Sequence, residues 1–444
     1  MYKILSIVIV LISACFSGAI AQEKPREFSP YSRFGIGDLA DPHFGAVSHL
    51  GGIAAAFTDR NQLNADNPAS LGALRSTAFE VGVSTKYTTL SSGDQRTRFF
   101  GGGLDYLALG LPLYNPINDL LNRNRRNLHI GTMFVLKPYS FVGYDISQID
   151  SIAGTGSYQR KYIGNGGTYE FKWSNGFEYK QFSGGIGLGY LFGKMTYKRE
   201  LDLLSVPLPY TTIFLNEISM RGVKWNAGIQ YKVNLKKLAE GEVESSRYLS
   251  VGIYGQSAQD FKTTSNEIYR RELIVTSTAG IVDTVRNVTD QPGTGVLPGE
   301  IHAGFYYNDK YKLQFGGQYS LVSWSKYKNS AKPEILQNAS HISFGAAYCP
   351  DIESLDNFLK RVTYRVGFRF GNDPRSFQNE QVKDFSVTFG AGVPFVYQRK
   401  VSFVNFAVEM GNIGLKDNLK SKYVQLKLGF TLNDDEWFLK SKYN

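Results

Sequence analysis

The chain contains little that could cross-link it or anchor it through a helix. Only two of its 444 residues are cysteine, Cys15 and Cys349. If an export signal removes Cys15, a disulfide within the chain becomes impossible. Beyond the apolar stretch at residues 4–12 there is no run of 18 or more apolar residues, so the sequence predicts no transmembrane helix. The fold must then depend on packing and on backbone hydrogen bonds.

Residues with catalytic or metal-binding chemistry are also scarce. The five histidines have no neighbouring cysteines, clustered carboxylates or nucleophile that would complete a site; they are His43, His49, His129, His302 and His341. The glycines at 101–103 lack the following Lys-Ser/Thr of a phosphate loop. We therefore expect no enzyme activity, no catalytic residue, no metal site and no cofactor, and we expect His43 and His49 to form hydrogen bonds.

The first 21 residues have the features of an export signal. Lys3 precedes the apolar stretch, and Ala19-Ile20-Ala21 is a small-x-small cleavage site before Gln22. We predict a signal peptide at residues 1–21. In an alternative interpretation, Ile12-Ser13-Ala14-Cys15 is a lipoprotein box, and Cys15 is acylated.

What the chain does have is alternation of apolar and polar residues. A period of two places alternate side chains on opposite faces of a strand. The last such segment has one apolar face (Val424, Leu426, Leu428, Phe430, Leu432) and one polar face (Gln425, Lys427, Gly429, Thr431, Asn433). In an exported chain without a helical anchor, this pattern is typical of outer-membrane barrels, which are apolar outside and polar inside.

Fourteen segments read as strands, an even number as in single-chain bacterial barrels. The expected strands are 77–90, 97–111, 128–148, 178–193, 194–205, 212–235, 246–259, 297–308, 310–325, 338–350, 361–373, 383–396, 398–412 and 420–433. The sequence therefore predicts an all-β fold, an antiparallel transmembrane β-barrel over residues 77–444. A closed barrel has no free edge.

Loop lengths predict the direction of the strands. If the N-terminal segment lies on the periplasmic side, the long connections at 149–177 and 260–296 fall outside the cell. Gly193-Lys194 and Asn308-Asp309 then form tight periplasmic turns. Four basic side chains on the polar strand faces should point into the lumen, because charge in lipid is costly; they are Lys224, Lys232, Arg365 and Arg369.

Residues 22–76 lack strand alternation and are rich in Gly, Ala, Ser, Asn and Pro. Such a segment before a barrel is either a disordered leader or a plug (hatch) in the lumen. Aromatic residues such as Tyr31, Phe34, Phe44 and Phe57 favour packing, and hence a plug.

The third predicted strand breaks the alternation. Met133, Phe134, Val135 and Leu136 are consecutive apolar residues, and Pro138 follows within the strand. Proline lacks the N–H that a ladder requires, so it belongs at a bulge or kink. One hypothesis is a lateral gap in the wall around Lys137-Pro138-Tyr139, lined by apolar residues. The alternative is a harmless bulge near the rim.

These features together resemble the long-chain fatty-acid transporter family of FadL/TodX-like barrels. The resemblance rests on a Gly/Ala-rich leader ending in Asn67-Pro68-Ala69, about fourteen strands, and a proline-broken third strand. The stretches 29–38 and 137–140 resemble a Bacteroidota branch of that family. The resemblance implies a hatch with its turn at Asn67, Pro68 and Ala69, a kink near Pro138, and passive entry of hydrophobic molecules through a side opening.

Three functions remain open from the sequence. The first is an outer-membrane barrel for uptake of hydrophobic, fatty-acid-like molecules, with gate residues Asn67, Pro68, Ala69, Phe134, Leu136, Pro138 and Tyr139. The second is a non-transporting structural subunit of a larger outer-membrane assembly or secretion complex. The third, a general porin, is disfavoured by an apolar plug. Expected partners are membrane lipids, a hydrophobic ligand and other outer-membrane proteins. The net charge of +10 is assigned to lumen and loop lysines, not to nucleic-acid binding.

Overall fold

The computed structural model describes residues 26–114, 127–153, 156–205, 210–236, 247–274, 280–310, 312–377, 380–397, 400–415 and 419–434. The predicted signal peptide lies outside these residues. The elements, with 3₁₀ helices labelled η, are η1 (Pro30–Arg33), β1 (Asp38–Leu39), α2 (Gly45–His49), η2 (Pro68–Ala73), β2 (Thr77–Ser92), β3 (Gln95–Pro112), β4 (Leu128–Ile152), β5 (Gly156–Tyr179), β6 (Phe182–Leu203), β7 (Thr211–Asn234), β8 (Arg247–Gln256), β9 (Gln259–Ile274), β10 (Gly280–Leu297), β11 (Glu300–Asp309), β12 (Leu313–Val322), η3 (Trp324–Lys326), β13 (Lys328–Asn329), β14 (Ala339–Tyr348), α4 (Phe358–Arg361), β15 (Thr363–Phe377), β16 (Glu380–Tyr397), β17 (Lys400–Gly414) and β18 (Lys420–Asp434).

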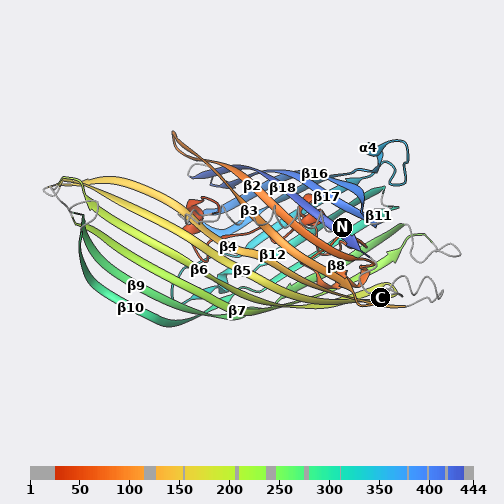
Figure 1. Cartoon of the computed structure of the whole chain (residues 1–444), viewed down its shortest axis with the longest axis horizontal. Helices are drawn as coiled ribbons and strands as arrows, with labels where there is room; N and C mark the ends of the chain where they lie inside the picture. The colour runs from red at the N-terminus through yellow and green to blue at the C-terminus, as the bar shows by residue number, and fades with distance from the viewer. Residues whose placement is uncertain are drawn as a thin grey trace, which may run out of the picture.

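The strands form one antiparallel sheet that closes on itself (Figure 1). Strand β18 pairs with β2, from Lys420 opposite Ser91 to Asp434 opposite Thr77. Both β8 and β9 pair with β7, so they are two parts of one wall strand, and β10 and β11 are related in the same way. The wall is therefore a closed barrel of fourteen strands, and the predicted fold class is confirmed. The short strands β1 and β13 are additional.

The alternation of the sequence separates an apolar outer face from a polar inner face. On β18, Val424, Leu426 and Phe430 are 38–44% exposed, whereas Lys427 and Thr431, which alternate with this apolar set, are buried. The same alternation recurs around the ring. Among the described residues, no helix is long and apolar enough to cross a membrane.

Six strands continue well beyond the apolar belt. The predicted loops at 149–177 and 260–296 are wrong, because β4 and β5 continue as a hairpin and β9 and β10 form another. These extensions project at the end opposite to α4 (Figure 1). Both of their faces carry polar residues, for example in Tyr158-Gln159-Arg160-Lys161, so the apolar alternation is lost although the backbone ladder persists.

The predicted turn at Gly193-Lys194 is also wrong. Both residues lie inside β6, and the turn occurs at Lys180, which has a φ of +56° between β5 and β6. The predicted number of strands was right because splitting β6 into two compensated for missing β5. Asn308 and Asp309 do end a strand, β11, and Lys312 N donates to Asp309 O at 2.8 Å in the following turn.

The chain before β2 has two parts. Residues 26–40, the bridging segment, contact β3 and β4. Residues 41–76, the lumen segment, include the buried residues Val47, Leu50, Leu63 and Leu71. Wall strands from around the ring donate hydrogen bonds to it, among them β4, β5, β7, β15 and β18. The lumen segment is therefore enclosed by the barrel.

Beyond the lumen segment, apolar side chains of the inner wall fill the interior of the barrel. Side chains from β4, β6, β7, β9 and β10 pack against residues around η3 and against Ile36 of the bridging segment. We call these residues the upper apolar cluster: Ile36, Val142, Tyr144, Leu191, Met195, Ile218, Met220, Phe261, Leu297, Trp324, Tyr327, Leu336 and Ala339. They form a packed core at this level of the barrel, where a channel would need open space.

Candidate functional site

The predicted hatch turn is the start of η2. Asn67 caps this helix, because its side chain accepts a hydrogen bond from Ala69 N at 3.0 Å. The other end of the same amide donates to Ala55 O at 2.6 Å. Asn67, Pro68 and Ala69 are all buried. Both ends of the Asn67 amide are therefore hydrogen-bonded within the lumen segment.

Glycines on four consecutive strands make room for η2. A Cβ added at Gly176 of β5 would lie 2.1 Å from Pro68 O, and one at Gly228 of β7 would lie 2.0 Å from the Asn67 side chain. Gly131 of β4 and Gly185 of β6 make similarly close approaches. Only glycine allows the lumen segment to approach the wall this closely.

The barrel ladder is incomplete between β3 and β4. These strands pair only from Leu107 opposite Leu136 to Pro112 opposite Gly131. In the described part of the chain, no backbone pair joins residues 95–106 of β3 to residues 137–152 of β4. We call this interval the seam. Pro138 lies just past its lower end, and the register on the β5 side shifts between Pro138 and Ser140.

The bridging segment covers the β3 side of the seam. Arg26 O accepts from Gly102 N at 3.1 Å, and the Arg26 side chain pairs with Asp105. Phe28 stacks on Phe99 with ring centroids 5.2 Å apart. Gly101, one of the glycines noted above, also fits here, since a Cβ would lie 2.2 Å from Arg26 O.

The same segment pairs with the β4 side. Ser29 N donates to Gly143 O at 2.7 Å, and Leu39 of β1 pairs with Ser140. Gly37, with φ of +99°, passes so close to β4 that a Cβ would lie 2.4 Å from Phe141 O. Residues 26–40 therefore hydrogen-bond to both edges that the wall leaves unpaired.

A cavity of about 340 Å³ lies between the bridging segment, the lumen segment and the wall. Of the predicted gate residues, Pro138 and Tyr139 line it, and Phe134 and Leu136 do not. Phe134 lies on the outer face, 36% exposed, with its ring 6.4 Å from that of Trp173. The structure thus places the predicted residues on two sides of the wall.

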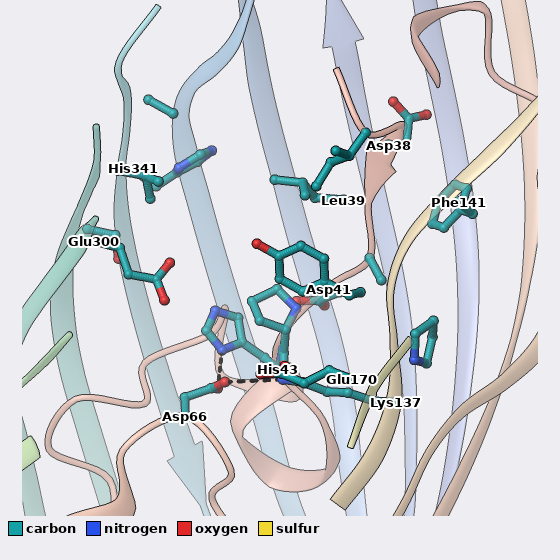
Figure 2. A pocket seen from close by; sticks show the side chains of 18 of the residues that line it. Asp38, Leu39, Asp41, His43, Asp66, Lys137, Phe141, Glu170, Glu300 and His341 are labelled. Atoms are coloured by element: carbon teal, nitrogen blue, oxygen red, sulfur yellow. Dashed lines mark hydrogen bonds and ion pairs between the residues drawn. The ribbon is translucent and has the colours of Figure 1, made fainter. Parts of the chain in front are cut away.

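Charged side chains meet at the floor of the cavity (Figure 2). His43 Nδ1 lies 2.6 Å from Asp66 Oδ2, and Lys137 Nζ lies 3.7 Å from Asp66 Oδ1. Burial disfavours the Asp66 carboxylate, but His43 and Lys137 outweigh burial and lower its pKa to about 2. Asp66 is therefore ionised at neutral pH and ties the lumen segment to β4.

Two of the predicted lumen lysines are buried and point inward. Lys224 lies 3.6 Å from Glu170 and 4.2 Å from the centre of the Tyr139 ring. Lys232 donates to Glu178 at 2.8 Å. Both lysines therefore have partners inside the lumen.

The predicted lumen arginines also point inward. Arg365 donates to Asn405 at 2.8 Å and to Gln62 of the lumen segment at 3.4 Å. Arg369 lies 3.3 Å from Glu409 and 3.7 Å from Asp41. Each arginine thus links the wall to the lumen segment.

The sequence did not identify the charge cluster around Lys427. Its Nζ lies 2.6 Å from Asp41, 2.7 Å from Glu409 and 2.8 Å from Ser48 Oγ. Burial opposes ionisation of Asp41, but Lys427 and Arg369 hold its pKa below the usual range. Strand alternation alone places Lys427 inward. Of its partners, Glu409 lies on β17, Ser48 in α2 and Asp41 in the irregular stretch before α2, and no sequence pattern brings these three elements together.

The histidines form no metal site in the described residues, where no group of three potential ligands occurs. His302 stacks on Tyr254, and His341 lies 3.6 Å from Asp384. His49 is buried, and burial together with Arg365 and Lys427 lowers its pKa well below the usual value.

Comparison with solved structures reproduces this architecture. A Pseudomonas aeruginosa FadL homologue has a TM-score of 0.56 and 12% identity, covering 89% of this chain and 99% of its own. The CymD monoaromatic hydrocarbon channel has a TM-score of 0.51 and 14% identity, covering 90% and 99%. The Ralstonia pickettii toluene transporter TbuX has a TM-score of 0.50 and 15% identity, covering 88% and 98%. At these identities the likeness concerns the fold.

The predicted resemblance to FadL/TodX-like barrels therefore holds for the fold. A search of curated proteins found no match to the chain. The family model described as BamG matches residues 1–444, and because this match spans the whole chain, the chain belongs to the BamG family.

Proposed function

We propose that the chain is an outer-membrane barrel that admits hydrophobic molecules through the seam between β3 and β4. The observation that carries this proposal is the ladder that ends at Leu107 and Leu136. An unpaired strand edge is costly in lipid, so a wall keeps one only where another segment covers it. The exposed apolar belt supports a membrane location.

The bridging segment would be the part that moves, with the lumen segment as the hatch beneath it. Movement of residues 26–40 exposes the cavity beside Pro138 and Tyr139. The three structural neighbours, a FadL homologue, a hydrocarbon channel and a toluene transporter, support this class of solute. The proposal includes removal of the signal peptide, residues 1–21, and a Bacteroidota origin of the chain.

A disulfide that fixes the bridging segment to β4 tests this function. Leu39 and Ser140 are paired residues in an antiparallel ladder, where Cα atoms lie about 4.5–5.5 Å apart and a disulfide can form. In a Cys349→Ser background, oxidised Leu39→Cys/Ser140→Cys should lower palmitate and toluene uptake by cells several-fold, and reduction should restore it.

The matched control is Ile342→Cys/Phe370→Cys, a pair between β14 and β15 away from the seam. Its oxidation should leave uptake unchanged. Uptake that is equal in the oxidised and reduced seam variant would show that solutes do not pass there.

A second function is favoured by the filled interior. The upper apolar cluster is packed, and the lumen segment is bonded to strands around the ring. These features suit a non-transporting subunit of a larger outer-membrane assembly. Purification in mild detergent with mass spectrometry separates the two: bound free fatty acid without a partner favours uptake, and a stoichiometric partner without bound free fatty acid favours the subunit.

A further inference from the structure

The wall has a second irregularity, on β7 and its neighbours. Strand β7 pairs with β9 up to Gly222 and with β8 from Ala227 onwards. Between these points a side chain replaces the backbone ladder: Gln259 accepts from Trp225 N at 2.9 Å and donates to Trp225 O at 2.7 Å. The next wall strand is also interrupted here, between Leu297 and Glu300.

A groove of about 1160 Å³ lies on the outer face below this interruption. Its sides are exposed apolar side chains, including Ile186, Trp225, Ile229 and Ile301, which are 40–52% exposed. Its floor contains Ala227 between Trp225 and Ile229 on the same face of β7. A small residue between large ones leaves a hollow in an otherwise apolar wall.

The groove runs the height of the apolar belt. Its lower end includes Leu128 and Phe182, at the first residues of β4 and β6. Its upper end lies just above β8, a strand of 10 residues. At about 3.3 Å per residue and a tilt near 40°, such a strand rises about 25 Å, which is the height of the belt in outer-membrane barrels. The upper end therefore lies at the outer interface.

Most of the polar side chains that line the groove lie at this upper end, and Asn175 of β5 is the exception. Gln256, Ser257, Ser323 and Lys326 line the groove there, and the Lys326 side chain is exposed. Glu300 is the acidic residue at this end, and it lies 3.7 Å from His302, which lines the internal cavity. An apolar trough with a cation at its interfacial end matches an acyl chain whose headgroup carries phosphate.

We propose that this groove binds one acyl chain of an anionic, phosphate-bearing lipid of the outer leaflet, with its phosphate at Lys326. The site is distinct from the seam. It depends on the barrel spanning a membrane, but not on transport, so the uptake experiment does not decide it.

Two outward tryptophans allow a matched test. Trp225 lines the groove and is 40% exposed, whereas Trp173 is 44% exposed on the outer face of β5 and does not line it. The protein is reconstituted into vesicles with a low fraction of brominated phosphatidylglycerol. The quenching of each tryptophan is obtained by difference. It is the quenching of fluorescence that the parent protein shows and the Trp225→Phe or Trp173→Phe variant lacks. We expect Trp225 to be quenched at several-fold lower bromolipid than Trp173.

Two further variants test the hollow and the cation. Ala227→Phe should remove the excess quenching, while Ala391→Phe, an outward alanine on β16 opposite Tyr364 and Phe406, should not. Lys326→Gln should remove a preference of about fivefold for brominated phosphatidylglycerol over brominated phosphatidylcholine.

Three results would overturn the proposal. Equal quenching of the two tryptophans would mean annular lipid only. Excess quenching that survives both Ala227→Phe and Lys326→Gln would exclude the assigned site. Protection of Trp225 from bromolipid by a co-purified protein would make the groove a protein interface. Heat-modifiable mobility on gels reports whether each variant is folded.

Discussion

At the scale of single residues, close approach and buried charge determine how the lumen segment sits. Gly176 and Gly228 let η2 contact the wall backbone. Asp66 and Asp41 face lysines on β4 and β18. A buried charge needs an opposite charge beside it to offset its desolvation. Each of these pairs therefore holds one residue of the lumen segment next to one residue of the wall.

Gly176→Ala should destabilise the protein, because the added Cβ would lie 2.1 Å from Pro68 O, a backbone atom that cannot rotate away. We expect a loss of about 1–3 kcal/mol in the free energy of unfolding, measured by urea titration in detergent micelles. The control is Gly103→Ala, whose Cβ would lie 3.5 Å from the flexible Arg26 side chain. Equal losses in both variants would contradict the close contact.

Asp66 should make the free energy of unfolding depend on pH in the acid range. Its pKa is about 2 in the folded protein and 3.8 ordinarily, so the folded state binds fewer protons between these values. The stabilisation, on the order of 2 kcal/mol, is present above pH 4 and is lost as pH falls toward 2.

Urea titrations between pH 6 and pH 2.5 measure this dependence. Asp66→Asn should be less stable at pH 6 and show a flatter acid profile. Asp94→Asn, in the exposed turn between β2 and β3, should follow the parent protein. A parent profile that is already flat would rule out the assigned role of Asp66.

At the scale of elements, the sequence predicts strands only where lipid contact imposes alternation. β18 and β15 were located within a few residues, because Val424, Val366 and their neighbours alternate with buried polar residues. The predicted loop at 149–177 covers nearly all of β5. Water on both faces of its upper half selects no pattern, but the alternation of exposed Phe171 and Trp173 with buried Lys172 in its lower half was overlooked. The inward direction of Lys224 followed from alternation, but the position of Asp66 beside Lys137 required the tertiary path of the lumen segment.

Gln259 should be needed to keep the wall intact at β7. Gln259→Leu leaves Trp225 N–H and C=O without their partner, and an unpaired backbone group costs about 1–3 kcal/mol. We expect faster hydrogen exchange at residues 223–226 and a lower unfolding free energy. Gln314→Leu removes a side-chain bond to Asn308 instead and should leave that exchange unchanged. Unchanged exchange in Gln259→Leu would mean that water already satisfies Trp225.

At the scale of the whole molecule, the described side chains pack inside the barrel at two levels. The lumen segment fills the part that the shorter strands surround, and the upper apolar cluster fills the part toward the extended strands. An aqueous channel through a barrel needs a clear lumen. The packing therefore disfavours the general porin, and it leaves a lateral path or no path for solutes.

Electrical recording tests this closure. The full-length protein in planar bilayers should show no steady ionic conductance, because both levels are packed. Deletion of residues 26–76 removes the bridging segment, with Ile36 of the upper cluster, and the lumen segment, and it should produce a stable conductance if the fourteen-stranded wall still folds. Heat-modifiable mobility on gels establishes that the deleted form is folded.

Steady conductance in the full-length protein would show that the lumen is open and would return the porin to consideration. A folded but silent deletion variant would mean that the upper cluster alone closes the barrel, in which case solutes could pass only through the seam.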